Sequence, residues 1–235
     1  MGSLRIRHAR KVFREEKLHA GLSGVSLGRS GRLPTFTLIE LLIVVAMIGI
    51  LAAIAVPNFI QAQIRSKVAR AKADLKSIST ALESYYLDQK AYPIARTFCA
   101  GSMSESDDYN ICPPEITTPV AYINHRPLDV FNPGRQYKYL APGLGYSNHV
   151  LTYLTIWVPK SFPSESGPDQ DLPYFSQETS PVDYGIWSVG PTGAKSFWES
   201  DVAHIPVPKR TWYNPSNGVI SQGIIARLSG GHQSP

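Results

Sequence analysis

The chain has 235 residues, of which 43% are hydrophobic and 17% are charged, so it can bury one sizeable core. Its formal net charge of +5 comes from residues 1–35, where eight lysines and arginines and two glutamates give +6, so residues 36–235 carry −1. A folded body without net positive charge argues against nucleic acid as a partner.

Residues 38–56 form an apolar segment in which Glu40 is the only polar residue. About twenty apolar residues cross a bilayer as a helix, so this segment is a predicted transmembrane span. Basic residues lie on both sides of it. The positive-inside rule therefore gives only a weak preference for a cytoplasmic amino terminus.

Two simpler interpretations of this apolar segment stay open. Ala53-Ile54-Ala55 matches a signal-peptidase site, which would make residues 1–55 a secretory signal, although its apolar core would be unusually long. A plain single-pass anchor explains the hydropathy but gives no reason for the carboxylate of Glu40.

After Pro57, apolar residues recur at intervals of three and four, which predicts an amphipathic helix. These residues are Ile64, Val68, Ala71, Leu75, Ile78, Leu82 and Tyr85. No turn cluster separates them from the apolar segment, so we expect one helix from about Phe36 to about Leu87, roughly 75 to 80 Å long. Pro57 lacks a backbone donor, and it predicts a kink or local melting.

Beyond Tyr92-Pro93 the chain is rich in proline, glycine and asparagine, with short β-branched or aromatic runs. The predicted strands are 136–140, 151–158, 184–189 and about 219–226, with turns at 132–134, 214–215 and 217–218. We predict an α+β fold, in which a long N-terminal helix packs against a small antiparallel sheet. The predicted parts are a basic leader (1–35), the helix (36–90) and a β-rich body (91–235).

Cys99 and Cys112 are separated by twelve residues, a spacing that matches no common zinc pattern. Outside the cytoplasm, a disulfide between them would close a loop of about fourteen residues and stabilise the fold by roughly 3 kcal/mol. Two unpaired thiols are the alternative.

Catalytic motifs are weak. Residues 24–28 match the nucleophile-elbow string but lie in the basic leading segment, and residues 190–196 resemble a phosphate loop in which Ala194 interrupts the pattern. The histidines are isolated. We therefore predict no enzyme, no catalytic residue and no metal-ligand set, with the acidic loop Glu105–Asp108 as a candidate calcium loop.

The string Phe36-Thr37-Leu38-Ile39-Glu40, followed by the apolar run, resembles the processing and methylation signature of type IV prepilins. Residues 81–88 and Tyr92-Pro93 are similar to the end of the major pseudopilin helix of type II secretion. The resemblance implies a pilin-like fold and a structural subunit of a pilus-like filament. It also implies a single-pass protein of the bacterial inner membrane, with its C-terminal body periplasmic or extracellular.

In such families prepilin peptidase, a membrane aspartic protease, removes the leader and methylates the new amino terminus. The resemblance places the cut between Thr35 and Phe36 and the methyl group on Phe36. The family usually has glycine before the cut, whereas this chain has Thr35 preceded by Pro34.

A carboxylate inside an apolar span costs roughly 2.5 to 3.5 kcal/mol, which indicates that Glu40 has a function and a partner. The resemblance implies that this partner is the Phe36 amine of a neighbouring subunit, because opposite charges in low dielectric offset their desolvation. The alternative is that Glu40 reaches the headgroups at the end of the span.

The implied partners are further copies in a homo-oligomeric filament, prepilin peptidase, other pseudopilins, an inner-membrane assembly platform and the membrane itself. No cofactor is implied. Some pseudopilins carry structural calcium in a C-terminal loop, but that loop holds few carboxylates here. The alternatives are a surface or DNA-uptake type IV pilin, and a membrane-anchored periplasmic enzyme or binding protein.

Overall fold

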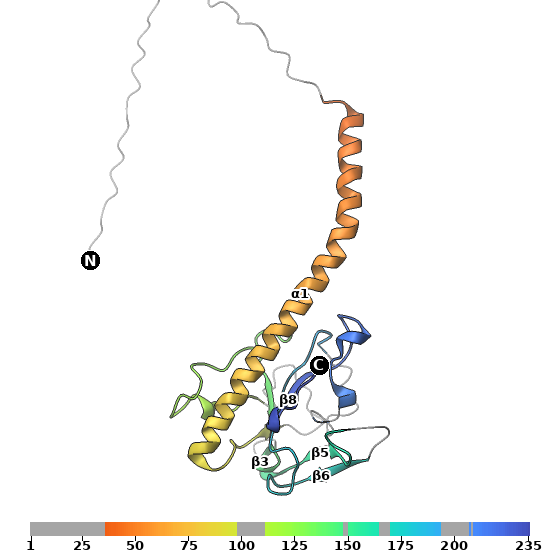
Figure 1. The fold of residues 1–235 in the computed structure, drawn as a ribbon. Coiled ribbons are helices and arrows are strands. Elements are labelled where there is room, and N and C mark those ends of the chain that lie inside the picture. The colour runs from red at the N-terminus through yellow and green to blue at the C-terminus, as the bar shows by residue number, and fades with distance from the viewer. Residues whose placement is uncertain (1–35, 98–110, 148–149, 165–169, 194–206, 208) are drawn as a thin grey trace, which may run out of the picture. The chain divides into compact units, whose positions relative to one another are not determined.

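The computed structural model describes residues 36–97, 111–147, 150–164, 170–193, 207 and 209–235. The predicted leader lies outside these ranges. The described chain divides between Gly49 and Ile50 into two compact units, and each is described by itself. Its architecture confirms the predicted α+β class: one long helix, and short strands that gather beside its C-terminal half (Figure 1).

The helix α1 spans Leu38–Gln89, 52 residues, which confirms the predicted helix with each end two residues later. Lys90 adopts a φ of 57° and its N–H donates to the Tyr86 carbonyl at 2.8 Å, a left-handed cap that ends the helix. The helix continues unbroken through Pro57, so the local melting considered for this position does not occur. A kink at Pro57 stays a prediction.

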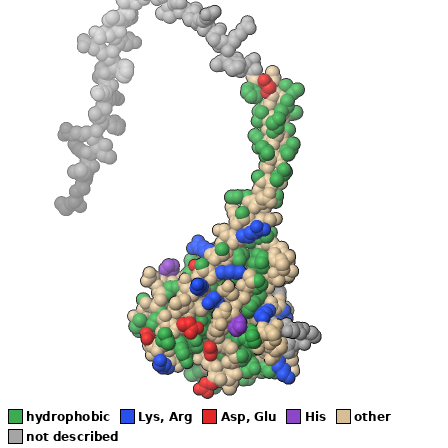
Figure 2. All heavy atoms as spheres, viewed as in Figure 1, with side chains coloured by type: hydrophobic (Ala, Val, Ile, Leu, Met, Phe, Trp, Pro, Cys, Tyr) green, Lys and Arg blue, Asp and Glu red, His purple; other side chains and the backbone are tan. Residues whose placement is uncertain are grey.

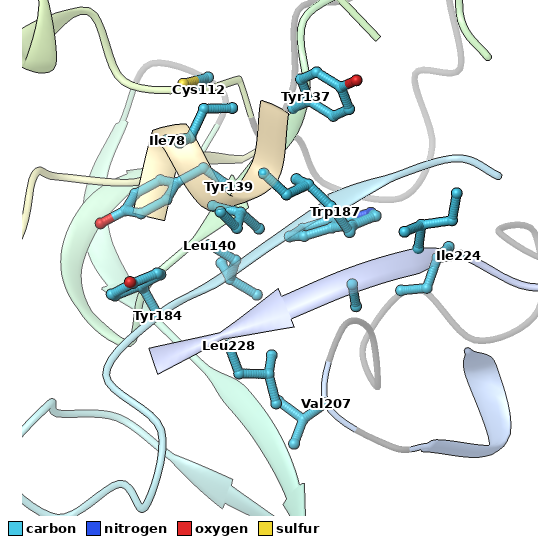
Figure 3. Packing of buried hydrophobic residues seen from close by; sticks show 14 of the residues in the cluster. Ile78, Cys112, Tyr137, Tyr139, Leu140, Tyr184, Trp187, Val207, Ile224 and Leu228 are labelled. Atoms are coloured by element: carbon cyan, nitrogen blue, oxygen red, sulfur yellow. The ribbon is translucent and has the colours of Figure 1, made fainter. Parts of the chain in front are cut away.

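One face of the C-terminal half of α1 is buried, as the spacing of its apolar residues predicts. The buried residues are Val68, Ala71, Leu75, Ile78, Ser79, Ala81 and Leu82. They pack on the central antiparallel sheet, whose strand order is β2 (Lys138–Leu140), β7 (Gly185–Ser188) and β8 (Ile225–Leu228). Figure 3 shows Ile78 of α1 above the strands that carry Tyr139, Trp187 and Leu228.

Two smaller sheets complete the body. In the first, β1 (Arg96–Thr97) runs parallel to β3 (Gly143–Ser147), which pairs antiparallel with β4 (Val150–Leu154). In the second, β5 (Ile156–Pro159) pairs antiparallel with β6 (Asp171–Tyr174). Short 3-10 helices connect these elements at Pro114–Ile116, Lys209–Thr211, Pro215–Asn217 and Ser229–Gly231.

The predicted strand at about 219–226 is largely wrong, because the strand begins only at Ile225. Residues before it belong to a turn in which the Ser221 N–H donates to the Gly218 carbonyl at 3.1 Å. Gly223 has a φ of 130°, and a Cβ there would lie 2.5 Å from the Tyr213 nitrogen. The backbone therefore passes Tyr213 too closely for any side chain, which prevents a regular strand at this point.

Other strands differ from the prediction for local reasons. The predicted 151–158 strand is divided at Thr155 into β4 and β5, which belong to different sheets. The prediction missed β3, which contains two glycines and so lacks a β-branched run, and β6, which contains Pro173. Proline is tolerated in β6 because, among the described strands, only β5 pairs with it.

Tyrosine hydroxyls from the body donate to carboxylates of α1 on either side of the buried stripe. Tyr184 donates to Glu83 Oε1 at 2.8 Å and Tyr92 donates to Glu83 Oε2 at 3.0 Å. Two further tyrosine–carboxylate pairs are Tyr137–Asp74 at 2.9 Å and Tyr122–Asp88 at 2.8 Å. Burial raises the pKa of Tyr184, Tyr92 and Tyr137, so these hydroxyls stay protonated donors.

A buried carboxylate fixes the predicted turn at 132–134. Asp129 is 2% exposed and accepts hydrogen bonds from the Ser188 hydroxyl at 2.7 Å, the Val189 N–H at 3.0 Å and the Phe131 N–H at 2.9 Å. Burial raises the pKa of Asp129, while these three donors oppose the rise. The carboxylate thus joins the turn to the end of β7.

Replacing Glu83 by glutamine places an NH₂ group against one of the two tyrosine hydroxyls that now donate to the carboxylate. We expect the free energy of unfolding of the full chain in detergent micelles to fall by about 1–2 kcal/mol, measured by denaturant titration. Glu178→Gln makes the same change at an exposed carboxylate and should stay within about 0.5 kcal/mol of wild type. Equal losses in both variants would contradict a stabilising role for the Glu83 contacts.

Candidate functional site: the exposed apolar segment and its first turn

The N-terminal part of α1 exposes large apolar side chains around its whole circumference. The exposed apolar surface continues past residue 56, so from here on the name apolar segment covers residues 38–60. Its exposed large side chains are Leu38, Ile39, Leu41, Leu42, Ile43, Val44, Val45, Met47, Ile48, Ile50, Leu51, Ile54, Val56, Phe59 and Ile60. Figure 2 shows hydrophobic side chains covering this part of the helix. The helix is long and apolar enough to cross a membrane, and none of its most apolar stretch is buried. Such a surface needs a bilayer or a protein partner.

Glu40 forms a capping box with Thr37 at the start of α1. The Thr37 N–H and hydroxyl donate to Glu40 Oε2 at 2.8 and 2.6 Å, and the Glu40 N–H donates back to the Thr37 hydroxyl oxygen at 3.3 Å. This reciprocal pattern satisfies backbone donors that a helix otherwise leaves without partners at its start. The carboxylate is therefore partly solvated by the chain itself, which lowers its cost in an apolar environment.

The sequence analysis missed this capping role, although the signal was present. Thr37-Leu38-Ile39-Glu40 matches the Ser/Thr-x-x-Glu string that precedes an apolar helical run. The two hydrogen bonds that Glu40 accepts both involve Oε2, and among the described residues Oε1 has no hydrogen-bond partner. One carboxylate oxygen is thus left for a partner outside the chain.

The other predicted site residues lie apart from this first turn. Phe36 precedes α1 and is 74% exposed, while Thr35 lies outside the described residues. Pro57 lies inside α1. Cys112 is fully buried in the hydrophobic core, and burial raises the pKa of its thiol to about 12. Cys99 lies outside the described residues, so the disulfide stays a prediction.

The described part of the body offers no clear catalytic or metal site. No group of three histidine, cysteine, aspartate or glutamate residues within it is placed to hold a metal ion. The candidate calcium loop, Glu105–Asp108, lies outside the described residues. An open hollow of about 360 Å³ is lined by Lys209, Trp212, Asn214, Gln233 and Pro235, a set without an acid–base pair.

Comparisons with known proteins agree with this geometry. The family described as type II secretion system (T2SS), protein G, matches residues 58–153. The type II secretion system core protein G of Pseudomonas aeruginosa is 37% identical over 108 residues, which cover 46% of this chain and 73% of that protein. The corresponding protein of Vibrio cholerae is 31% identical over 108 residues, 46% of this chain and 70% of that protein.

The type IV major pilin protein PilA of Myxococcus xanthus is 60% identical over 57 residues, which cover 24% of this chain and 26% of the pilin. The chain thus spans about a quarter of the pilin but more than two thirds of the core proteins G. No solved structure gives a significant match.

The long helix, its exposed apolar segment and the small sheets define a membrane-anchored, single-pass protein of the pilin-like class. Within that class, the chain belongs to the family of type II secretion system protein G, the pseudopilins.

The capping box predicts a local effect of Thr37. Thr37→Ala removes the hydroxyl that accepts from the Glu40 N–H and should destabilise the first turn by about 1 kcal/mol. Amide hydrogen exchange of that turn, measured on the full chain in detergent micelles, should become about fivefold faster. Thr37→Ser keeps the hydroxyl and serves as the control. Unchanged exchange in Thr37→Ala would show that the capping box does not hold the turn.

Proposed function

We propose that this chain is a structural subunit of a pilus-like filament, most similar in role to a type II secretion pseudopilin, and that it is not an enzyme. The observation that carries this proposal is the apolar segment, which continues the same helix that packs on the body but buries nothing itself. A bilayer covers such a segment while the subunit is stored, and neighbouring copies cover it in a filament. Heterologous contacts between identical subunits extend into an open helical assembly.

Prepilin peptidase would mature the chain by cutting between Thr35 and Phe36 and methylating the new Phe36 amine. The position of α1 supports this proposal, because the helix begins at Leu38, and Phe36, on the carboxyl side of the proposed cleavage bond, precedes it. Cleavage before Phe36 also preserves the Thr37 amide, which donates to Glu40. A cut one residue later would convert that amide into a charged amine and change the capping box.

Glu40 would pair with the Phe36 amine of the neighbouring subunit. Its Oε2 serves the capping box, and Oε1 is left for the amine. Pairing opposite charges offsets their desolvation and sets the register between copies. One carboxylate can therefore cap its own helix and position the next one.

The proposed location is the bacterial inner membrane, with the β-rich body periplasmic. The proposed partners are further copies, other pseudopilins, the inner-membrane assembly platform and prepilin peptidase, with no nucleic acid and no cofactor. A surface type IV pilin is the second candidate, favoured by the identity to the Myxococcus xanthus pilin. The core proteins G align over 108 residues rather than 57, which favours the pseudopilus.

Intact-mass measurement on protein purified from native membranes tests the proposed maturation. We expect a chain that begins at Phe36 and is one methyl group heavier than residues 36–235. Protein from cells that lack prepilin peptidase should keep all 235 residues and serves as the reference. Retention of residues 1–35 in the native protein would refute cleavage at this bond.

Glu40→Gln tests the proposed pairing and leaves capping intact, because glutamine also serves at this position of a capping box. The variant should insert into membranes normally. Assembly, measured in cells by crosslinks between cysteines placed along the apolar segment, should fall at least about tenfold because the neighbour's amine is left buried and unpaired. Thr37→Ala keeps the charge and should assemble better than Glu40→Gln. Normal crosslinking in Glu40→Gln would contradict the charge pairing.

A further inference from the structure

Basic side chains follow the apolar segment on α1. No charged residue lies between Glu40 and Arg65, and then Arg65, Lys67 and Arg70 follow within six residues. We call these three residues the basic collar; all of them are exposed. Figure 2 shows lysine and arginine side chains where the hydrophobic part of the helix ends.

The collar residues point to different sides of the helix within about 7.5 Å along its axis. At about 100° per residue, Lys67 and Arg70 lie roughly 200° and 140° around the axis from Arg65. Arg65 and Arg70 are separated by about 7.5 Å along the axis, and Arg65 lies about 7.5 Å beyond Ile60. Arg65 and Lys67 therefore fall within roughly one Debye length, about 10 Å, of the end of the apolar segment, and Arg70 lies about 15 Å from it.

The collar has little compensation within the described chain. Arg70 reaches Asp74 only at 3.9 Å, and Asp74 already accepts from Tyr137. Arg65 and Lys67 form no ion pair with any described residue. Lys72, the next basic residue, differs because its ammonium donates to the Pro235 carbonyl and burial lowers its pKa, so we leave it out of the collar.

We propose that the basic collar binds the phosphate headgroups of anionic phospholipids at the membrane surface next to the body. This inference rests on the proposed membrane storage of the subunit. Charges on different sides of a helix can all reach the membrane surface that surrounds it. A guanidinium group can donate two parallel hydrogen bonds to the oxygens of one phosphate. The collar would thereby set the depth of the apolar segment and hold the stored subunit until it is extracted.

An acidic surface on a second copy is the competing occupant, and the described residues of the body supply little of one. Most described carboxylates are engaged within the chain: Asp74, Glu83, Asp88, Glu115, Asp129, Asp171 and Asp183. Among the described residues of the body, Glu178 is the exposed carboxylate without such a contact. Charge complementarity therefore favours lipid over the described surface of another copy.

The test is lipid selectivity of the full chain in phosphatidylcholine vesicles, measured with spin-labelled phosphatidylglycerol or phosphatidylcholine by electron spin resonance. At about 0.01 M sodium chloride, where the Debye length is about 30 Å, the wild type should prefer phosphatidylglycerol severalfold. In Arg65→Gln/Lys67→Gln, the loss of each charge that contacts headgroups should lower that preference by about fivefold, until no preference is left. About 1 M salt should have the same effect on the wild type.

Lys90→Gln/Lys160→Gln is the matched control, because it removes the same charge from exposed positions at the C-terminal cap of α1 and in the body, and it should keep the wild-type preference. An equal loss in both double variants, or no preference in the wild type, would overturn the proposal. Loss of preference in sodium phosphate but not in chloride of equal ionic strength would assign the collar to free phosphate instead of lipid.

Two outcomes separate this inference from the proposed function. Unchanged lipid selectivity in Arg65→Gln/Lys67→Gln, together with lost copy-to-copy crosslinks, would assign the collar to a second copy and leave the filament proposal standing. Absence of any motionally restricted lipid around the wild-type chain would overturn both the collar and membrane storage.

Discussion

The burial of one stripe of α1 on the β2-β7-β8 sheet is the interaction on which the rest of the structure depends. Burying an apolar side chain fully contributes about 1.5–3 kcal/mol, and stripe residues such as Leu75, Ile78 and Leu82 are at most 1% exposed. The same helix carries the apolar segment, whose side chains cover every side. A one-sided stripe is matched by a sheet, whereas an all-round apolar surface is matched by lipid or by a bundle of helices. The pattern of side chains along one helix therefore assigns its two parts to different environments.

Polar contacts fix how that stripe sits on the body. The strands are short, and hydrogen bonds from side chains supplement the few that such strands form. Beside the stripe, Glu83 accepts hydrogen bonds from two tyrosine hydroxyls. Asp129 accepts three hydrogen bonds from the turn and the end of β7. Apolar packing alone tolerates small slips along a helix, but a buried donor that loses its acceptor costs free energy. The Glu83 contacts thus favour one register of the helix on the sheet, and the Asp129 contacts hold the turn against the end of β7.

The sequence predicted the helix, its buried stripe and the apolar segment because those features depend on local periodicity. It predicted the body less well. The strand expected at about 219–226 failed because Gly223 must pass close to Tyr213, and β3 was missed because its glycines pair with β4 without a local strand pattern. Both depend on contacts between two segments of the chain, and not on a pattern within one segment. The tyrosine–carboxylate pairs could not be predicted for the same reason. The capping box of Thr37 and Glu40, in contrast, follows from a local sequence pattern that the sequence analysis missed.

The capping role of Glu40 need not compete with its proposed pairing with a neighbouring subunit. A carboxylate has two oxygens with several lone pairs, and the capping box involves only Oε2. The two donors from Thr37 make the charged form of Glu40 less costly in an apolar environment, and they hold its side chain at the start of the helix. In the proposed pairing, an amine that approaches Oε1 therefore meets an acceptor that is already oriented. Because the side chain is held before the partner arrives, less conformational entropy is lost on pairing, and a single acid can both begin one helix and receive the terminus of another.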